Sequence, residues 1–167
     1  MADVSAVRSK TFEWADPIAT AEQVLGMSGL EYMHAVRDGT AAWPPMGVLM
    51  SIDLVEAERG RVVMTCSPGE EHYNPLGIIH GGLLCTLLDT VMGCATHTTL
   101  EQGTGYTSIE LKVSYLRPVT LDTGALTATG SVVKEGRRVV FAEGGVADAD
   151  GNLVATASSS LLVLSAR

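Results

Sequence analysis

Apolar residues recur every three to four positions between Leu83 and Ala95, which is the spacing of one broad face of an α-helix. Asp89 points away from this apolar stripe, and it is the only Asp, Glu, Lys or Arg between Tyr73 and Leu100. A surface helix normally carries charges on its outer face. The pattern therefore predicts a helix that is covered on both sides, by the chain's own sheet on one side and by a second subunit on the other.

On either side of this helix the pattern changes to the alternation and β-branched content of strands. Residues 48–57 and 61–67 predict a hairpin joined at Glu58-Arg59-Gly60. Four more strands are expected over 106–116, 125–133, 138–148 and 153–164, with Gly-bearing turns at 134–137 and 149–152. Two strands, one long helix and four strands predict an α+β fold, in which a single helix covers the apolar face of an antiparallel sheet.

The first part of the chain has weaker signals. Residues 1–21 are expected to form a loosely held extension. Residues 21–39 predict one or two short helices, broken near Ser28-Gly29 and ended by Gly39. Trp43-Pro44-Pro45 predicts an extended or turn segment. We therefore divide the chain into an N-terminal extension with short helices over 1–47 and one domain over 48–167.

Composition and charge narrow the classes of function. A composition of 46% hydrophobic and 18% charged residues indicates a globular protein. A formal net charge of −8 argues against nucleic acid as a partner, because such binding depends on neutralising phosphates. No run approaches the ~18 uncharged apolar residues of a membrane span, and the N-terminus lacks a secretory signal. Three cysteines without a disulfide or metal spacing favour a cytoplasmic protein with reduced thiols.

Six polar or glycine positions form a spaced set around the helix start. Asn74 is followed six residues later by His80-Gly81-Gly82, then by Asp89, and Ser108 opens the next predicted strand. In this combination the chain, from about residue 48 to 164, resembles the hotdog-fold acyl-CoA thioesterases, specifically the phenylacetate-pathway (PaaI-like) branch. The resemblance implies a hotdog fold, a curved antiparallel sheet wrapped around one long central helix. It also implies hydrolysis of an acyl- or aroyl-CoA to the free acid and CoA, with no cofactor.

The resemblance further implies roles for five residues of this set. Asp89 would be the general base or the nucleophile, and the backbone N–H of Gly81 would bind the thioester oxygen. Asn74 and His80 would line the site, and Ser108 would help to hold the attacking water. Asp89 and Ser108 would come from one protomer, and Asn74, His80 and Gly81 from its partner.

Helix geometry independently favours a site shared between subunits. The first N–H groups of a helix have no intrahelical acceptor and lie at its positive end, and glycines let a carbonyl approach the backbone closely. Asp89 lies about 12 Å further along the axis, at 1.5 Å per residue, which is too far to act on a carbonyl held by its own Gly81. We therefore expect an isologous homodimer with two equal sites, assembling into a homotetramer.

Coenzyme A carries phosphates, so basic side chains and the glycines of the helix start are its expected contacts. Gly82, Arg117, Lys134, Arg137 and Arg138 are the candidates for binding CoA. Solvated turn charges are the commoner explanation for the basic residues.

Each candidate catalytic residue also has a structural explanation. Asp89 could be a hydrogen-bonded helix carboxylate, His80 a helix cap, Asn74 a loop-stabilising residue and Ser108 an ordinary strand serine. A metal site is not supported by the spacing of His72, His80 and His97.

Two other functions remain open from the sequence. A hotdog enoyl-CoA hydratase or dehydratase would change the absorbance of an enoyl-CoA. A non-catalytic acyl-CoA binding module would bind the ester without releasing a free thiol.

Overall fold

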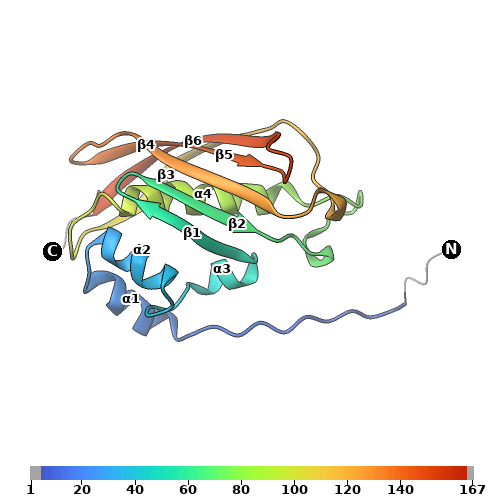
Figure 1. Ribbon diagram of the computed structural model, residues 1–167, viewed down its shortest axis with the longest axis horizontal. Helices are drawn as coiled ribbons and strands as arrows, with labels where there is room; N and C mark the ends of the chain where they lie inside the picture. The colour runs from blue at the N-terminus through green and yellow to red at the C-terminus, as the bar shows by residue number, and fades with distance from the viewer. Residues whose placement is uncertain (1–4, 165–167) are drawn as a thin grey trace.

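Within residues 5–164, which the structure describes, a six-stranded antiparallel sheet curves around one long helix in this computed structural model (Figure 1). The strand order is β1-β2-β4-β5-β6-β3, so β1 and β3 form the two edges. The strands are β1 (Ile52–Glu58), β2 (Arg61–Cys66), β3 (Gly105–Tyr115), β4 (Leu126–Lys134), β5 (Val139–Ala147) and β6 (Leu153–Leu164). The predicted α+β arrangement is confirmed.

The central helix, α4 (Gly81–His97), begins where the sequence predicts. His80 precedes it with extended backbone, and its Nδ1 accepts a hydrogen bond of 2.8 Å from the Gly82 N–H. Leu87, Leu88 and Val91 are fully buried against the sheet, as their helical spacing predicts. No helix among the described residues is long and apolar enough to cross a membrane.

Two glycines in the sheet let α4 lie unusually close to it. Gly130 of β4 and Gly144 of β5 are paired across the two strands. A Cβ atom on Gly130 would lie 2.5 Å from the Val91 carbonyl oxygen, and one on Gly144 would lie 3.1 Å from Met92 Cγ. Because the first of these contacts is with backbone, side-chain movement cannot relieve it. The glycine pair therefore sets the distance between helix and sheet.

Three short helices precede the sheet: α1 (Pro17–Leu25), α2 (Gly29–Arg37) and α3 (Pro45–Leu49). α2 packs against α4, α1 against α2, and α3 against β1. Asp16 caps α1, and Ser28 and Glu31 form a capping box at the start of α2. Gly39 adopts a φ of 72°, which confirms the predicted end of the second helix. Tyr32 and Met33 of α2 belong to the buried core.

The segment before α1 is extended along one side of the molecule (Figure 1). Two ion pairs join it to the loop before α4: Arg8 with Glu70, at 3.2 Å, and Lys10 with Glu71. The first four residues of the predicted extension, 1–4, lie outside the described residues.

Two sequence predictions about this region are wrong in detail. Residues 48–51 do not begin the first strand, because Pro45 starts the short helix α3 and Ser51, with a φ of 52°, turns the chain into β1 at Ile52. The first helix begins at Pro17 rather than near residue 21, since Asp16 caps it and proline suits its first position.

The outer face of α4 is also covered differently from the prediction. Gly93 packs under the Tyr106 ring, and α2 packs against His97, where a Cβ on Gly29 would overlap the histidine. The chain's own elements thus cover the C-terminal half of this face. Its remaining outer residues, Cys85, Thr86, Asp89 and Thr90, are half-buried.

The substitution Gly130→Ala tests the close approach of helix and sheet. We expect it to lower the free energy of unfolding by about 1–3 kcal/mol, because the added methyl group forces backbone apart. Chemical denaturation measures the change. Gly105→Ala is the matched control, since its Cβ would meet nothing nearer than Leu164 Cβ at 4.0 Å. Equal stability of the two variants would contradict this explanation.

Candidate active site

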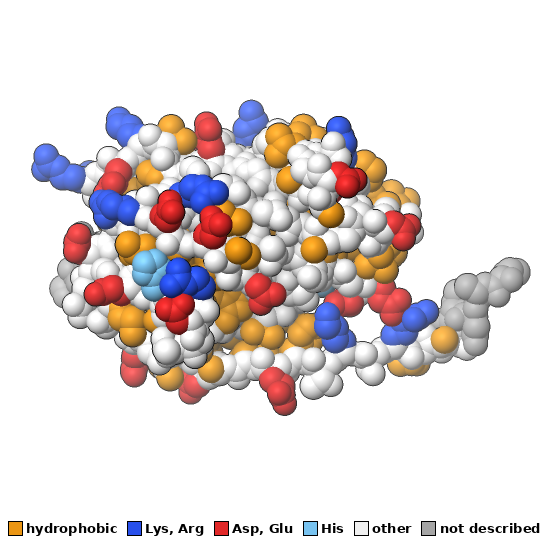
Figure 2. Space-filling model, viewed as in Figure 1, with side chains coloured by type: hydrophobic (Ala, Val, Ile, Leu, Met, Phe, Trp, Pro, Cys, Tyr) orange, Lys and Arg blue, Asp and Glu red, His pale blue; other side chains and the backbone are white. Residues whose placement is uncertain are grey.

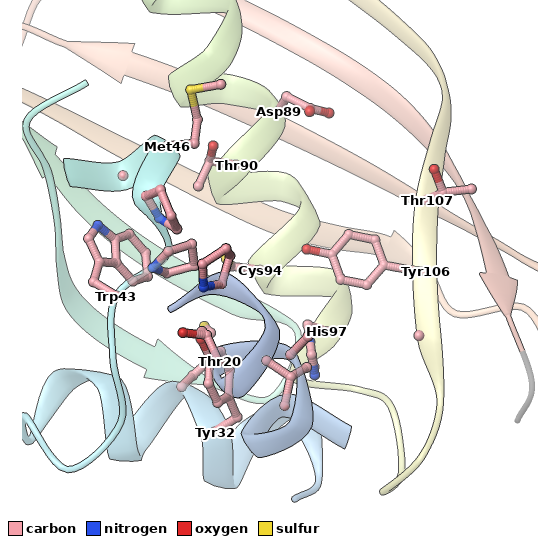
Figure 3. Close-up of a pocket in the computed structure, with 18 of the residues that line it drawn as sticks. Thr20, Tyr32, Trp43, Met46, Asp89, Thr90, Cys94, His97, Tyr106 and Thr107 are labelled. Carbon is pink, nitrogen blue, oxygen red and sulfur yellow. The ribbon is translucent and has the colours of Figure 1, made fainter. Parts of the chain in front are cut away.

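A cavity of about 740 Å³ lies between α4, β3 and the N-terminal helices (Figure 3). Its walls are mostly apolar or aromatic, and Asp89 is the only charged side chain among the described residues that line it. The lining residues are Pro17, Thr20, Ala21, Val24, Tyr32, Met33, Trp43, Pro44, Pro45, Met46, Gly47, Asp89, Thr90, Cys94, His97, Gly105, Tyr106, Thr107 and Ser108. The volume is in the range of small-molecule binding sites.

The structure brings Asp89 and Ser108 together at this cavity. The Ser108 hydroxyl donates a hydrogen bond of 2.7 Å to Asp89 Oδ1. The pairing of β3 with β6 shifts register between Ser108 and Glu110, and such irregularities re-aim side chains. Ser108 is therefore half-buried beside α4, whereas Ile109 points outward and is 56% exposed. Among the described residues, Asp89 Oδ2 has no hydrogen-bond partner.

The start of α4 forms a second group of candidates, in a neighbouring cleft lined by Asn74, Gly81, Tyr115 and Arg117 among others. No acceptor for the Gly81 N–H lies within residues 5–164, as expected at a helix start. Asn74 Oδ1 accepts hydrogen bonds from the N–H groups of Leu76, at 2.8 Å, and Ile78, at 3.4 Å. Asn74 thus has the loop-stabilising contacts that the sequence offered as an alternative.

His80 and Gly82 line a separate cleft on the other side of the helix start, together with Thr86. The His80 ring is exposed, and its hydrogen bond with Gly82 gives it a capping function. The described chain therefore places Asp89 and Ser108 in one cleft and Asn74 and Gly81 in another. The two groups are separated along α4 by eight residues, or about 12 Å.

The candidate CoA-binding residues do not form one patch within a protomer. Arg117 lies in the cleft with Gly81. Lys134, Arg137 and Arg138 are exposed at the β4–β5 hairpin, at the opposite end of α4. Arg59 marks this end, because it contacts both Glu135 of the hairpin and the Thr99 carbonyl after α4. On the face shown in Figure 2, basic side chains stand among acidic ones.

Sequence reasoning missed three tyrosines at these clefts, Tyr115, Tyr32 and Tyr106. Tyr115 donates a hydrogen bond of 3.1 Å to the Gly81 carbonyl oxygen and lies beside the helix start. Trp43 and Tyr32 come from the segments before the sheet, and the Tyr106 hydroxyl points toward α4 (Figure 3). These positions depend on packing between distant segments, and no local spacing indicates it.

The titratable groups at the far end of the cavity are uncharged at neutral pH, and burial shifts each pKa further toward the neutral form. Burial raises the pKa of the Cys94 thiol to about 12 and that of the Tyr32 hydroxyl to about 12. It also raises the pKa of Tyr106 well above its usual value and lowers that of His97. The His97 ring is stacked on Tyr32, with centroids 5.9 Å apart, and meets the Tyr106 ring edge-on at 5.6 Å.

Comparison with known proteins identifies the family. A profile of the thioesterase superfamily matches residues 76–155. A putative esterase of Saccharolobus solfataricus is 30% identical over 115 residues, which cover 69% of this chain and 80% of that protein. Human acyl-coenzyme A thioesterase 13 is 35% identical over 94 residues, or 56% of this chain and 66%, just under two thirds, of the human protein.

Solved structures agree with this result. A putative thioesterase of Ralstonia eutropha, described as a phenylacetic acid degradation-related protein, superposes with a TM-score of 0.72 and 27% identity, covering 78% of this chain and 98% of that one. A Streptococcus mutans protein bound to acetyl CoA superposes with a TM-score of 0.63 and 27% identity, covering 70% of this chain and 90% of that one. The chain therefore belongs to the thioesterase superfamily. The predicted hotdog fold is thereby confirmed.

The buried His97 gives a prediction about pH and stability. Because its pKa is lowered by folding, the unfolded chain binds a proton more readily, so stability falls as pH decreases below about 6.5. The slope from this one group is at most about 1.4 kcal/mol per pH unit. We expect His97→Phe to show a smaller loss of unfolding free energy than the wild type between pH 7 and pH 5. Denaturation at both pH values measures this, and an identical loss in both proteins would contradict it.

Proposed function

We propose that this protein is an acyl-CoA thioesterase that hydrolyses a thioester at Asp89. The observation that carries the proposal is the hydrogen bond between Ser108 and Asp89 at an otherwise uncharged cavity, in a chain of the thioesterase superfamily. A carboxylate at an apolar cavity can act on a carbonyl carbon with little competition from bulk water. The acyl group would lie in the cavity, with its thioester beside Asp89.

Asp89 would act with Ser108 holding it in place. The Ser108 O–H occupies Oδ1, which leaves Oδ2 for the reaction. As a general base, Oδ2 takes a proton from water while the water oxygen adds to the carbonyl carbon. The C–S bond then breaks, and the proton passes to the departing thiolate of CoA. The same geometry serves direct attack by Oδ2 on the carbonyl carbon, which breaks the C–S bond, releases the CoA thiolate and forms a mixed anhydride that water then hydrolyses.

The helix start would stabilise the negative charge that develops on the thioester oxygen. The Gly81 N–H is free to donate, and the helix dipole adds positive potential at this point. Since Asp89 lies about 12 Å away along the same helix, the donor would be Gly81 of the partner subunit. Asn74 and His80 of the partner subunit would line the same site.

A dimer that builds such sites is supported by an exposed sheet edge. The edge strand β3 is eleven residues long. Two of its apolar residues, Ile109 and Tyr115, are 56% and 54% exposed. An unpaired edge of this kind is suited to pairing with a second copy. In an isologous dimer each protomer contributes to two sites. Assembly into a tetramer and the cytoplasmic location remain predictions from the sequence.

Coenzyme A would lie outside the acyl cavity. Arg117 is the best-placed candidate for the CoA phosphates because it shares a cleft with Gly81. Gly82 follows Gly81 in the sequence. Lys134, Arg137 and Arg138, at the other end of α4, would reach the same CoA only from a neighbouring subunit.

Replacing the two hydrogen-bonded residues tests their roles. We expect Asp89→Asn to lower kcat by about a hundredfold or more while KM changes little, because the carboxylate acts mainly in the transition state. Ser108→Ala should lower kcat by about tenfold, the value of one hydrogen bond to a charged group. Thiol release from a CoA ester measures both. Asp53→Asn, on the exposed face of β1, is the control and should keep wild-type turnover. Full activity of Asp89→Asn would remove Asp89 from the chemistry.

A mixing experiment tests whether sites are shared between subunits. Asp89→Asn and Gly81→Val should each be inactive alone, the second because its side chain blocks the helix start. When the two are unfolded, mixed in equal amounts and refolded together, hybrid dimers should contain one intact site. Random pairing then restores about a quarter of wild-type activity. Sites contained within single subunits would give no recovery.

A further inference from the structure

The far end of the acyl cavity holds a histidine without a hydrogen-bond partner. His97 lines the cavity and is 6% exposed. Its described contacts are the Tyr32 and Tyr106 rings, and neither ring nitrogen has a partner among residues 5–164. The one fully buried side-chain polar atom without a partner among the described residues is Thr96 Oγ1, so the His97 nitrogens keep some accessible surface. Because His97 lines the cavity, these nitrogens are available to a ligand group that reaches this end of it.

The distance between the two ends limits what this ligand can be. Asp89 and His97 are eight residues apart on α4, or about 12 Å along its axis. An extended acyl chain of about ten carbon atoms spans this distance, because a zigzag chain with bonds of about 1.5 Å and angles of about 111° advances about 1.25 Å per bond. Between the ends the walls include Trp43, Tyr106 and Cys94, which suit the methylene groups of such a chain.

The far wall comes from a part of the chain outside the family match. Thr20 and Val24 of α1 and Tyr32 of α2 line the cavity, and the Tyr32 ring stacks on His97, whereas the family profile covers residues 76–155. Trp43 is fixed by a hydrogen bond of 2.6 Å from its Nε1 to the Ile52 carbonyl oxygen. These N-terminal residues thus close the cavity with a specific shape.

We propose that His97 is a specificity-determining residue that hydrogen-bonds a hydroxyl group at the far end of a medium-length acyl chain. The proposal rests on the function proposed above, because the thioester of the same acyl group lies at Asp89 and Ser108. A neutral imidazole has one donor and one acceptor nitrogen, and a hydroxyl group can pair with either. A second carboxylate on the acyl group would be disfavoured, since Asp89 is the only charged group lining the cavity among the described residues and is negative.

Burial supports the neutral form of the ring. It lowers the pKa of His97, so the imidazole carries no charge at neutral pH. The Thr20 hydroxyl, which donates to the Asp16 carbonyl oxygen at 2.9 Å, lies on the same wall and retains acceptor capacity.

Two pairs of CoA esters test the proposal on the wild-type protein. We expect kcat/KM for thiol release from 10-hydroxydecanoyl-CoA to exceed that from decanoyl-CoA by about five- to tenfold, the value of one neutral hydrogen bond. The pair 6-hydroxyhexanoyl-CoA and hexanoyl-CoA should show a ratio near one, because the shorter chain does not reach His97. A ratio near one for the ten-carbon pair would overturn the proposal.

Variants then assign the preference to His97. His97→Phe keeps a ring but removes both nitrogens, so the ten-carbon ratio should fall to about one. His97→Gln restores a donor and an acceptor and should recover part of the preference. His34→Phe is the matched control, since His34 of α2 contacts the Ala57 carbonyl oxygen and does not line the cavity, and it should keep the wild-type ratio. An unchanged ratio in His97→Phe would overturn the assignment. Should that variant fail to fold, the wild-type ratio and His97→Gln decide.

A binding measurement separates this proposal from the proposed function. If no CoA ester releases thiol, the thioesterase function fails, and calorimetry with the uncharged esters methyl 10-hydroxydecanoate and methyl decanoate tests the cavity directly. A dissociation constant about five- to tenfold lower for the hydroxy ester supports the His97 site. Equal dissociation constants for the two esters would overturn it.

Discussion

The close packing of α4 on the sheet at Gly130 and Gly144 determines where the site lies. Because these glycines bring the helix backbone against β4 and β5, the buried stripe of α4 has no freedom to rotate. Asp89 is held on the opposite side of the helix by the same contact. β3, at the sheet edge, then needs only one register shift to bring Ser108 to the carboxylate. The position of the candidate catalytic pair is thus a consequence of how the core packs.

The N-terminal segments turn this half-open face into a cavity. α1, α2 and the residues before α3 supply about half of the lining, and they place aromatic rings around the end of α4. Burial there raises the pKa values of Cys94 and Tyr106 and lowers that of His97. The wall is therefore neutral, and the charge that the cavity presents is that of Asp89. Such a division suits a substrate whose reactive bond lies at one end and whose chain is apolar over most of its length.

The sequence predicted the helix and strands in which apolar residues recur at regular spacing. The apolar stripe of α4 and the Gly-bearing turns of the hairpins are local patterns, so the helix and the strand order along the chain could be found from them. The short helix α3 was missed, because Pro44 and Pro45 indicate a turn as readily as the first turn of a helix.

The site could be predicted only in part. The resemblance pointed to Asp89 and Ser108, and the hydrogen bond between them agrees with it, whereas their catalytic roles remain proposals. Which side chains form the wall around His97 could not be predicted, because this depends on how residues 17–47 pack against a helix that begins more than thirty positions later. His97 entered the sequence analysis only as a metal candidate, and its surroundings make it a part of the cavity wall.

The extended segment before α1 is joined to the loop at Glu70 and Glu71 through the side chains of Arg8 and Lys10. These pairs are largely exposed, so dissolved salt weakens them much more than it weakens the apolar core. Rising ionic strength would therefore release this segment from the loop that leads into α4 while the sheet stays intact. The protein thus contains, on the loop that leads into α4, an attachment whose strength depends on the electrolyte.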